Sequence, residues 1–558
     1  MPRPGPGWQA LCRPAPYEIR QFEIPMSQTL AVFRNRTFRG LWLGTVASNM
    51  GGLVQQVGAA WLMATMTSSA TMIALVQACV TLPIMLGSYP AGVLADCRDR
   101  RRIMQVAQIF MAVVSAALAV LAWMGQVTPV VLLVFTALVG CGTALQFPAW
   151  QSSIGGLVVR DELPAAISAN AMGTNLTRSL GPALGGAIVA AAGSAMAFAV
   201  NALSYLAVIV ALWRWRPARS ENDLPAESLF PAMRAGVVYC LSSGDKLGAI
   251  WRGFLFCLAA IGVQALLPAL VRDEIAGGAS IYGIMLGAFG AGAVGAALVS
   301  TRLRARYGLE TTCRLGFVAF ALAVAALAIA PGLGLGIAAL LVCGAAWLTV
   351  LSLVNISIQV STPKWVLGRM MAIYMTAIFG GMTLGSWLWG YVSTLGGLHL
   401  ALLLSAGLLL LGAAWGLWAP LVAAEPDSIL PAELPASPQP RVALGHDSGP
   451  VRISVEYVIP VEREGSFLTV MEARRRSRAR SGVSNWSLYH DVEAPSQWIE
   501  TYGFATWGDY LRQRARKTRQ DEAIIAQLHA LHHGDHPPQV RRIVGTRRPQ
   551  TLRAPPLP

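Results

Sequence analysis

Long apolar runs fill most of the chain, and polar residues gather between those runs and after the last of them. Residues 39–419 are mostly apolar, whereas residues 420–558 are not. The apolar region divides into about twelve segments of roughly 20 residues, the length at which an α-helix crosses a bilayer. Because lipid cannot satisfy free backbone groups, each segment is predicted to be helical. The expected helices are 39–64, 70–94, 103–124, 128–149, 165–190, 194–214, 247–270, 279–301, 312–331, 334–358, 368–393 and 397–420.

Polar and Pro-rich stretches divide the chain further. The stretch after the sixth predicted helix carries Pro and acidic residues, which indicates a linker with an interfacial helix. The stretch before residue 451 is rich in Pro, Ala and Ser, which is typical of a flexible spacer. The predicted units are a disordered extension at 1–26 with Met26 as an alternative start, six-helix halves at 27–214 and 247–420, a cytoplasmic linker at 215–246, a flexible linker at 421–450, a soluble α+β domain at 451–545 and a disordered tail at 546–558.

The C-terminal region has the alternation of a small mixed domain. Strands are expected at 451–458, 486–492, 497–505 and 540–544, with helices at 461–480 and 507–530. This β-α-β-β-α-β order is the ferredoxin-like pattern. The basic run Arg474–Arg480 is interpreted as a solvated helix face, with contact to anionic lipid as the alternative. Four histidines, at 529, 532, 533 and 536, have no cysteine near them, and no metal is expected there.

Composition and charge support a membrane protein. Apolar residues make up 54% of the chain and charged residues 13%, against about 25% charged residues in a typical soluble domain. The formal charge of +15 invites a nucleic-acid interpretation, but the basic residues alternate from one loop to the next, with Arg272 the main exception. By the positive-inside rule this alternation predicts that both termini are cytoplasmic. The basic groups are Arg34, Arg36 and Arg39; Arg98 to Arg102; Arg160; Arg214, Arg216 and Arg219; Arg302, Arg304 and Arg306; Lys364 and Arg369.

One basic loop occurs twice. Its first copy runs from Gly92 to Arg102. In the second copy Leu298 matches Leu94, and the arginines at 302, 304 and 306 match those at 98, 100 and 102. The segments 179–186 and 383–390 match at the same offset. Two distant segments that share one offset indicate a duplicated membrane unit, and parallel halves of this kind are typical of transporters.

The first copy resembles the signature of the major facilitator superfamily between helices 2 and 3, Gly-x-Leu-Ala-Asp-Arg-x-Gly-Arg-Arg. Gly92, Leu94, Ala95, Asp96, Arg100 and Arg101 match it, whereas Cys97 and Asp99 depart from it. Aspartate at the second glycine position is similar to the branch of enterobactin exporters and macrolide efflux proteins, the transmembrane secretion effectors. The segments 38–44, 148–151, 160–164 and 379–382 also resemble this branch. The C-terminal domain is similar to antibiotic biosynthesis monooxygenase modules, which often pair.

The resemblance implies an all-α membrane protein of the twelve-helix major facilitator fold, in two six-helix halves, with a small ferredoxin-like α+β domain at its C-terminus. It also gives the basic loop a role. Asp96 lies at the cytoplasmic end of helix 2, and helix 11 begins on the same side near Gly368, so its positive N-terminal end attracts a carboxylate. Gly92, Asp96, Arg100 and Arg101 are therefore predicted to form a conformational latch that favours the outward-open state. The alternative is a basic loop that only sets topology.

A second motif, Gly181-Pro182-x-x-Gly185-Gly186, lies in helix 5. Proline removes a backbone hydrogen bond, and the glycines let another helix approach closely. The segment resembles the helix 5 motif of major facilitator exporters; ordinary small-residue packing is the alternative.

Arg178 lies about a dozen residues into helix 5, roughly 18–20 Å along it. A charge at that depth usually faces a cavity or a partner. We therefore expect Arg178 to meet an anionic substrate, and a structural arginine bonded to carbonyls is the alternative. Further candidates to line a substrate cavity are Asn49, Gln55, Gln56, Gln146, Gln264 and Asn355, for which hydrogen bonding between helices is the alternative.

Together these features predict a secondary exporter of small organic molecules, of drug or siderophore type, that works by alternating access and is driven by protons. No Gly-x-x-x-x-Gly-Lys-Ser/Thr loop is present, which argues against ATP drive. No catalytic residue, cofactor, metal or nucleic-acid partner is expected. The expected partners are an anionic or amphipathic solute, the lipid bilayer of a bacterial inner membrane, and a second copy paired through the C-terminal domain. An importer of the same fold and a transporter fused to a substrate-modifying monooxygenase-like domain are the alternatives.

Overall fold

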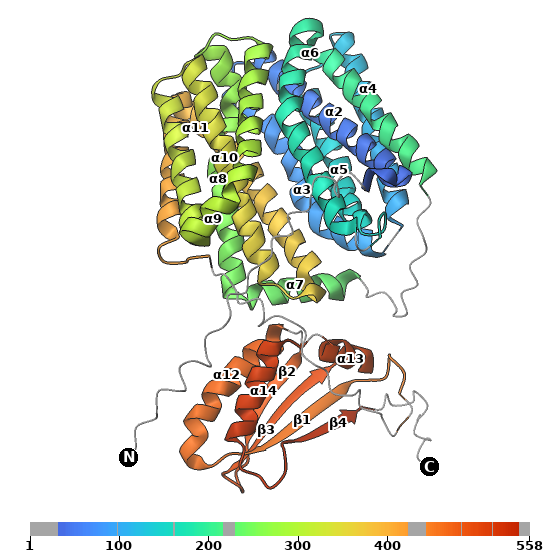
Figure 1. The fold of residues 1–558 in the computed structure, drawn as a ribbon, viewed down its shortest axis with the longest axis vertical. Coiled ribbons are helices and arrows are strands. Elements are labelled where there is room, and N and C mark those ends of the chain that lie inside the picture. The colour runs from blue at the N-terminus through green and yellow to red at the C-terminus, as the bar shows by residue number, and fades with distance from the viewer. Residues whose placement is uncertain are drawn as a thin grey trace, which may run out of the picture.

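The computed structural model describes residues 32–545 apart from 98, 160–161, 216–228, 422–441, 443, 481–482 and 516. The described residues form a bundle of long helices and, beyond one end of it, a small region built on a β-sheet (Figure 1). The predicted segments 1–26 and 546–558 lie outside the described residues, as do most of the predicted linker 421–450 and the first part of the linker 215–246.

Most helices of the bundle are long and apolar. In the described part of the chain, eight helices have the length and hydropathy needed to cross a membrane, and this makes the chain a multi-pass membrane protein. A further helix, α2, has 31 residues and packs among them. The bounds are α2 (Arg36–Met66), α3 (Ala70–Cys97), α4 (Arg100–Trp123), α5 (Pro129–Ile154), α6 (Leu163–Arg214), α8 (Gly244–Asp273), α9 (Ala279–Ile329), α10 (Leu333–Val360) and α11 (Lys364–Trp415); a short 3-10 helix, η1 (Val32–Arg34), precedes α2.

Three of these elements are pairs of helices joined by a single glycine. Gly193 in α6, Gly308 in α9 and Gly397 in α11 have φ values of 77°, 79° and 84° with ψ near 170°. This region of backbone space is open almost only to glycine. Each glycine reverses the chain without an intervening loop, and the three pairs correspond to predicted neighbouring helices. The loop expected between 301 and 312 is therefore wrong, because helix continues up to Gly308 and resumes directly after it.

Polar residues set the first turns of several helices. The side chain of Asn35 accepts hydrogen bonds from the backbone N–H groups of Thr37 and Phe38 at the start of α2. Thr128 caps α5 in the same manner, immediately before Pro129. Such caps satisfy backbone donors that have no partner inside the helix. Helices α2, α4 and α8 begin three residues before the predicted starts, α3 and α9 begin where they were predicted, and α11 begins at Lys364 and not near Gly368.

Contacts between helices group the bundle into two parts. Helix α6 packs against α2 and α4, and α5 packs against α3, within the first part of the chain. In the second part α9 packs against α10, and α8 against α11. The most extensive contacts between the parts join α3 with α11 and α6 with α9, and smaller ones join α3 with α8 and α2 with both α8 and α9. These crossing pairs are the contacts that must change if the two parts move against each other.

A short helix, α7 (Leu229–Leu241), lies across one end of the bundle (Figure 1). The hydroxyl of Tyr89 in α3 donates a hydrogen bond to the carbonyl of Met233 at 2.5 Å. The ring of Tyr239 meets Trp365 of α11 edge-on, with centroids 5.7 Å apart. Helix α7 therefore touches both parts of the bundle. We call the end of the bundle that α7 crosses the α7 end, and the opposite end of the bundle the far end.

The C-terminal region is a four-stranded antiparallel sheet with helices on one face. Its strand order is β2-β3-β1-β4. Alternate residues of β1 and β3, among them Ile453, Tyr457 and Tyr502, are buried beneath the helices with Phe467. The bounds are β1 (Val451–Val458), η4 (Val461–Arg463), α12 (Glu464–Arg480), β2 (Ser484–His490), β3 (Gln497–Phe504), α13 (Trp507–Ala515), α14 (Arg519–Leu531) and β4 (Gln539–Val544).

Two predictions for this region need correction. The single helix expected over 507–530 is two helices, because Thr518 and Asp521 form a capping box that starts α14 afresh. The basic run is only partly solvated: Arg475 and Arg476 are exposed, whereas Arg474 and Arg478 are buried against the sheet. Residues four apart lie on one face of a helix, so one face of α12 is basic and buried.

The sheet region meets the bundle at α7 (Figure 1). Helix α12 contacts α7 directly. Burial raises the pKa of Tyr239 to about 12, and the charges of Arg480 in α12 and Asp521 in α14 act on the same hydroxyl, the first lowering the pKa and the second raising it. The C-terminal end of α12 and the first turn of α14 therefore lie at the surface of the C-terminal region that faces the transmembrane helices.

Candidate functional site

Direct contacts close the far end of the bundle between its two parts. Arg272, at the end of α8, donates hydrogen bonds to the carbonyls of Thr67, at 2.7 Å, and of Ala64. The rings of Trp61 in α2 and Tyr282 in α9 are stacked, with centroids 6.2 Å apart. Arg272, the exception to the alternating charge pattern, therefore joins the two parts at the end opposite α7.

Small residues let α6 and α9 approach within backbone contact. A Cβ atom on Gly283 would lie 2.6 Å from the Cα of Gly186 and 2.8 Å from the carbonyl oxygen of Pro182. Further along the pair, Gly287 faces Ala183 at 3.3 Å, and Gly290 faces the backbone of residues 178 and 179. Close approach of this kind needs small side chains on both helices.

The predicted helix 5 motif divides between two neighbours. Gly186 and the Pro182 carbonyl meet α9, in the other part of the bundle. Gly181 and Gly185 instead face α2, where an added Cβ would lie 2.8 Å from the Leu53 side chain and 3.0 Å from the Val54 backbone. The motif therefore holds α6 against a helix of its own half and against one of the opposite half at the same time.

Hydroxyl pairs follow the second crossing contact, between α3 and α11. Thr71 hydrogen-bonds to the Gly390 carbonyl at 3.0 Å and to the Thr394 hydroxyl at 2.7 Å. Nearer the middle of the helices, the hydroxyls of Thr81 and Thr383 are 2.8 Å apart. Each hydroxyl can exchange one partner for another as the helices slide, because the hydroxyl hydrogen rotates freely.

The predicted latch residues lie at the α7 end. Gly92 in α3 is near α11, where an added Cβ would be 3.9 Å from that of Ala372. Arg100 hydrogen-bonds to the Ser152 carbonyl, and Arg101 to the carbonyls at 212 and 213 at 2.9 and 3.0 Å. The side chain of Asp96 lies outside the described residues, so the carboxylate–helix contact is untested.

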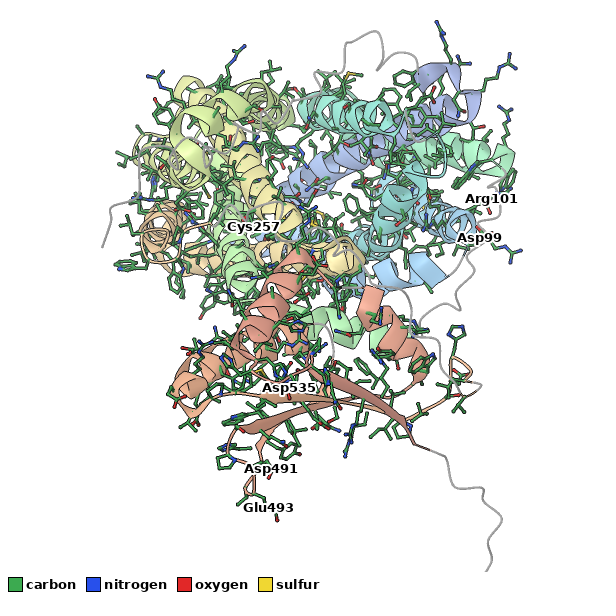
Figure 2. All side chains as sticks on the ribbon, turned by 60° about the horizontal axis from the view of Figure 1, so that its bottom comes forward. Asp99, Arg101, Cys257, Asp491, Glu493 and Asp535 are labelled. Atoms are coloured by element: carbon green, nitrogen blue, oxygen red, sulfur yellow. The ribbon has the colours of Figure 1, made fainter. Side chains whose placement is uncertain are left out.

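Asp99, a departure from the major facilitator signature, has a local role. Its side chain accepts a hydrogen bond from the backbone N–H of Arg101 at 3.0 Å and so caps α4. Figure 2 shows Asp99 and Arg101 close together at the edge of the bundle. Aspartate is a strong N-cap, and its charge is favourable at the positive end of a helix.

Arg178 is half-buried near the middle of the first helix of α6, the one that precedes the turn at Gly193. In the part of the chain that the structure describes, its guanidinium makes no hydrogen bond or ion pair, while its backbone carbonyl faces Gly290 across the α6–α9 contact. The structural alternative, bonding to helix carbonyls, therefore has no support from a described contact. The position beside the contact between the two halves suits a group that meets a solute.

The polar cavity candidates do not form one cluster. Gln55 is buried and accepts a hydrogen bond from Asn201 at 2.6 Å, within the first half of the chain. The same Asn201 amide also reaches Tyr205 at 3.1 Å. Gln56 bonds to Gln77 of α3 at 2.7 Å. Both glutamines therefore have hydrogen-bond partners inside their own half. This agrees with the alternative of hydrogen bonding between helices at least as well as with a role in lining a cavity.

The remaining candidates differ in exposure. Asn49 is exposed, and Gln264 is half-buried. Gln146 is half-buried, and its side-chain oxygen is buried with no hydrogen-bond partner among the described residues. Asn355 accepts a hydrogen bond from Gln359, one turn later in α10. Among the residues described here, no hydrogen bond joins any two of the seven predicted cavity residues.

One buried ion pair in the second half is not among the sequence predictions. Arg252 of α8 is 2% exposed and bonds through both of its terminal nitrogens to Glu310 of α9. Glu310 was expected in a loop, and only the turn at Gly308 shows that it starts a helix. The apolar surroundings of Arg252 are the signal that a partner was needed, since a buried charge is nearly always paired.

Comparisons with known proteins agree with this architecture. A model of the transmembrane secretion effector family matches residues 27–550. The chain is 24% identical over 278 residues to the staphyloferrin A transporter of Staphylococcus aureus, covering 49% of this chain and 69% of that one. It is 26% identical over 309 residues to the enterobactin exporter EntS of Salmonella typhimurium, covering 55% and 73%.

Solved structures of similar shape are also transporters. A bacterial homolog of the human lysosomal transporter Spinster, in an inward-facing conformation, superposes with a TM-score of 0.54 at 15% identity, covering 69% of this chain and 97% of that one. The nucleoside transporter NupG superposes with a TM-score of 0.55 at 14% identity, covering 69% and 98%. At these identities the likeness concerns the fold, a mostly helical major facilitator type. The chain belongs to the transmembrane secretion effector family of major facilitator membrane transporters, and it is not an enzyme.

Proposed function

We propose that this chain is a secondary active exporter of siderophore-like small organic molecules that works by alternating access. The observation that carries the proposal is the uneven distribution of contacts between the two halves. Backbone contact at Gly186 and Gly283, the Arg272 hydrogen bonds and the Trp61–Tyr282 stack all lie toward the far end. Contacts concentrated at one end suit a state in which a central site opens toward the other end.

The orientation follows from the charges. Among the described residues, members of the alternating basic groups such as Arg101, Arg304 and Arg369 lie at the α7 end. By the positive-inside rule that end is the cytoplasmic side of a bacterial cell membrane, with both termini in the cytoplasm. In this orientation the far end is external, and the conformation is inward-facing. The division into six-helix halves, linkers and a C-terminal domain is part of the same proposal.

The latch belongs to the transport cycle. Gly92 of α3 faces Ala372 of α11, so these two helices are neighbours on the cytoplasmic side, and α11 begins there at Lys364. A carboxylate at residue 96 can therefore approach the positive end of α11 when the cytoplasmic side closes. The contact would favour the outward-open state and help release of the exported solute.

The substrate class rests on the named relatives and on Arg178. One relative is a staphyloferrin A transporter and others are enterobactin exporters. An arginine fork in the membrane suits a solute with acidic oxygen groups, because it donates two parallel hydrogen bonds to a carboxylate. The proton gradient is the proposed energy source.

We also propose that the C-terminal region is a ferredoxin-like domain, similar to antibiotic biosynthesis monooxygenase modules, that pairs with a second copy. The sheet face opposite the helices is open to such a contact. Ile543, on the edge strand β4, is 55% exposed, and Arg541 forms an ion pair with Glu456 on that face.

Transport in oriented vesicles tests the direction. Inside-out vesicles that contain the chain should accumulate enterobactin or staphyloferrin A when the interior is acidic, and an uncoupler should abolish the accumulation. Vesicles with the Gly186→Leu variant, which cannot form the α6–α9 contact, serve as the control. Accumulation only in right-side-out vesicles would establish the importer and contradict the proposal.

A further inference from the structure

A cavity of about 800 Å³ lies in the C-terminal region between the sheet and helices α12, α13 and α14. Its floor includes the buried residues Tyr457, Arg474 and Arg478. On its other side it is lined by His529 of α14 and Arg542 of β4, which are exposed. Its volume falls in the range of about 300–1,000 Å³ that is typical of small-molecule sites.

The wall of this cavity is strongly basic. Among the described residues, its lining includes five cationic side chains and one carboxylate, that of Glu522. The cations come from α12, from α13, from the connection between α13 and α14, and from β4, so they converge on the space and are not one solvated face of a helix. They are Arg474, Arg478, Arg514, Lys517 and Arg542.

A single buried carboxylate serves two of these arginines. Glu500 of β3 lies 3.4 Å from the Nε of Arg478 and 3.5 Å from the Nε of Arg474. The same carboxylate also accepts hydrogen bonds from Trp486 at 3.0 Å and from Tyr457 at 3.2 Å. Glu500 therefore cannot neutralise both guanidinium groups. The Nε of Arg474 is buried and has no hydrogen-bond partner among the described residues, which is a costly state for a charged donor.

Lys517 adds to this excess of positive charge. Burial, and after it the charges of Arg478, Arg474 and Arg514, lower the pKa of its ammonium group to about 8. Asp521 acts in the opposite direction and does not compensate for them. A neutral ligand would leave this repulsion in place, whereas an anion would relieve it.

Two tyrosines supply further donors. The Tyr502 hydroxyl accepts a hydrogen bond from Arg478 at 2.7 Å, and the Tyr510 hydroxyl accepts one from Arg542 at 2.8 Å. Both residues line the cavity. A hydroxyl that accepts one hydrogen bond can still donate its own hydrogen. The cavity therefore offers hydroxyl donors beside the charged ones.

We propose that this cavity binds a small organic anion that carries two or more carboxylate groups. The arginine forks match the planar geometry of carboxylates. One carboxylate would leave part of the excess charge in place, which is why the proposal specifies at least two. The site lies on the cytoplasmic side of the proposed exporter, and α12, which carries two of its arginines, also contacts α7. Binding here does not depend on the direction or substrate of transport.

Titration calorimetry on the purified full chain in detergent tests the proposal, with citrate as the probe at pH 7. We expect saturable binding of one citrate per chain. Lys517→Met should weaken it by roughly tenfold or more, the usual effect of losing a charge-assisted hydrogen bond. The citrate-free Lys517→Met protein should melt no lower than the parent, because the variant removes a repulsive charge. A residue that served only the fold would give the opposite melting result.

Arg452→Gln is the matched control, since Arg452 is exposed on the opposite face of β1 and its loss removes the same charge. It should leave citrate affinity within twofold of the parent. Sulfate, which lacks carboxylates, should bind at least tenfold more weakly than citrate. The proposal is overturned by the absence of citrate binding, by equal affinity in the Lys517→Met variant, or by sulfate affinity equal to that of citrate.

Discussion

Arg252 and Glu310 form a two-point ion pair that ties three segments of the second half together. The terminal nitrogens of Arg252 lie 2.6 and 2.8 Å from the two carboxylate oxygens of Glu310. Glu310 also accepts the backbone N–H of Leu421 at 2.8 Å, just after α11. Helices α8 and α9 and the chain that leaves α11 therefore meet at one carboxylate at the α7 end.

We predict that Arg252→Met destabilises the chain more than Glu310→Gln. The first leaves the half-buried carboxylate of Glu310, whose side chain is 21% exposed, without its partner. Breaking a buried pair from one side costs up to about 3–5 kcal/mol. Glutamine keeps an oxygen for Leu421 and for one nitrogen of Arg252. Melting temperature in detergent measures the difference. The double variant Arg252→Met/Glu310→Leu should recover part of the loss, and a double variant as unstable as Arg252→Met would show that the pair is not the cause.

The α6–α9 contact gives a second prediction. Gly283→Ala should impair transport strongly, because its Cβ would lie 2.6 Å from the Cα of Gly186, a backbone atom that cannot yield locally. Gly295→Ala is the control in the same helix, since nothing lies within 4 Å of an added Cβ there. That variant should transport normally and gain up to about 1 kcal/mol from helix propensity. Equal transport by both variants would contradict a role for the close contact.

Hydrophobicity predicted the helices well, and the differences have local causes. Apolar runs place the helices because lipid demands them, but they do not detect caps such as Asn35 or turns made by one glycine such as Gly308. They also do not show which face of an apolar helix meets the other half. Gln55 was assigned to a cavity from its polarity alone, and its partner Asn201 is far away in sequence.

The C-terminal cavity was missed for a related reason. The run from Arg474 to Arg480 has the composition of a solvated helix face. The only sign of a buried charge is Glu500, which alternates in β3 with Trp498 and Tyr502 and so points to the same buried side of the sheet. That alternation was visible in the sequence. The pairing of α12 with β3 was not, because it depends on the tertiary fold.

Arg178 gives a third prediction. Arg178→Lys keeps the charge and loses the planar fork, so it should fold normally and transport an acidic solute poorly. Arg178→Ala should insert normally and lose transport. Folded yield and transport are measured on the same samples. Reduced yield of both variants would indicate a structural arginine, and normal transport by both would exclude Arg178 from the site.

The latch gives a fourth prediction. Asp96→Asn should leave membrane insertion intact, shift the chain toward the inward-open state and slow export, because an amide is attracted less by the positive end of α11. Accessibility labelling at both ends of the bundle reports the shift. Asp99→Asn is the control: asparagine caps a helix about as well as aspartate, so α4 and the labelling pattern should be preserved. Unchanged labelling and full transport in Asp96→Asn would contradict the latch.

The fifth prediction concerns the dependence of stability on pH. In the folded chain the pKa of Lys517 is lowered to about 8, whereas an ordinary lysine titrates near 10.5. Between these values the unfolded chain binds the proton more strongly than the folded chain, so this group makes stability rise with pH. Below about pH 8 both states are protonated, and its destabilising effect is fully present.

The groups that act on Lys517 allow this effect to be isolated. The charged groups that act on Lys517 are Arg474 and Arg478 of α12, Arg514 of α13 and Asp521 of α14, and the Lys517→Met variant keeps all four. We therefore compare the melting temperatures of the citrate-free parent and of citrate-free Lys517→Met. The value for the parent minus that for the variant should increase as pH rises from 7 to 9.5. Other groups that titrate in this range affect both proteins equally and cancel in the difference. Parallel melting curves would mean that Lys517 is not held in a repulsive field, and would remove one of the supports for an anion in the cavity.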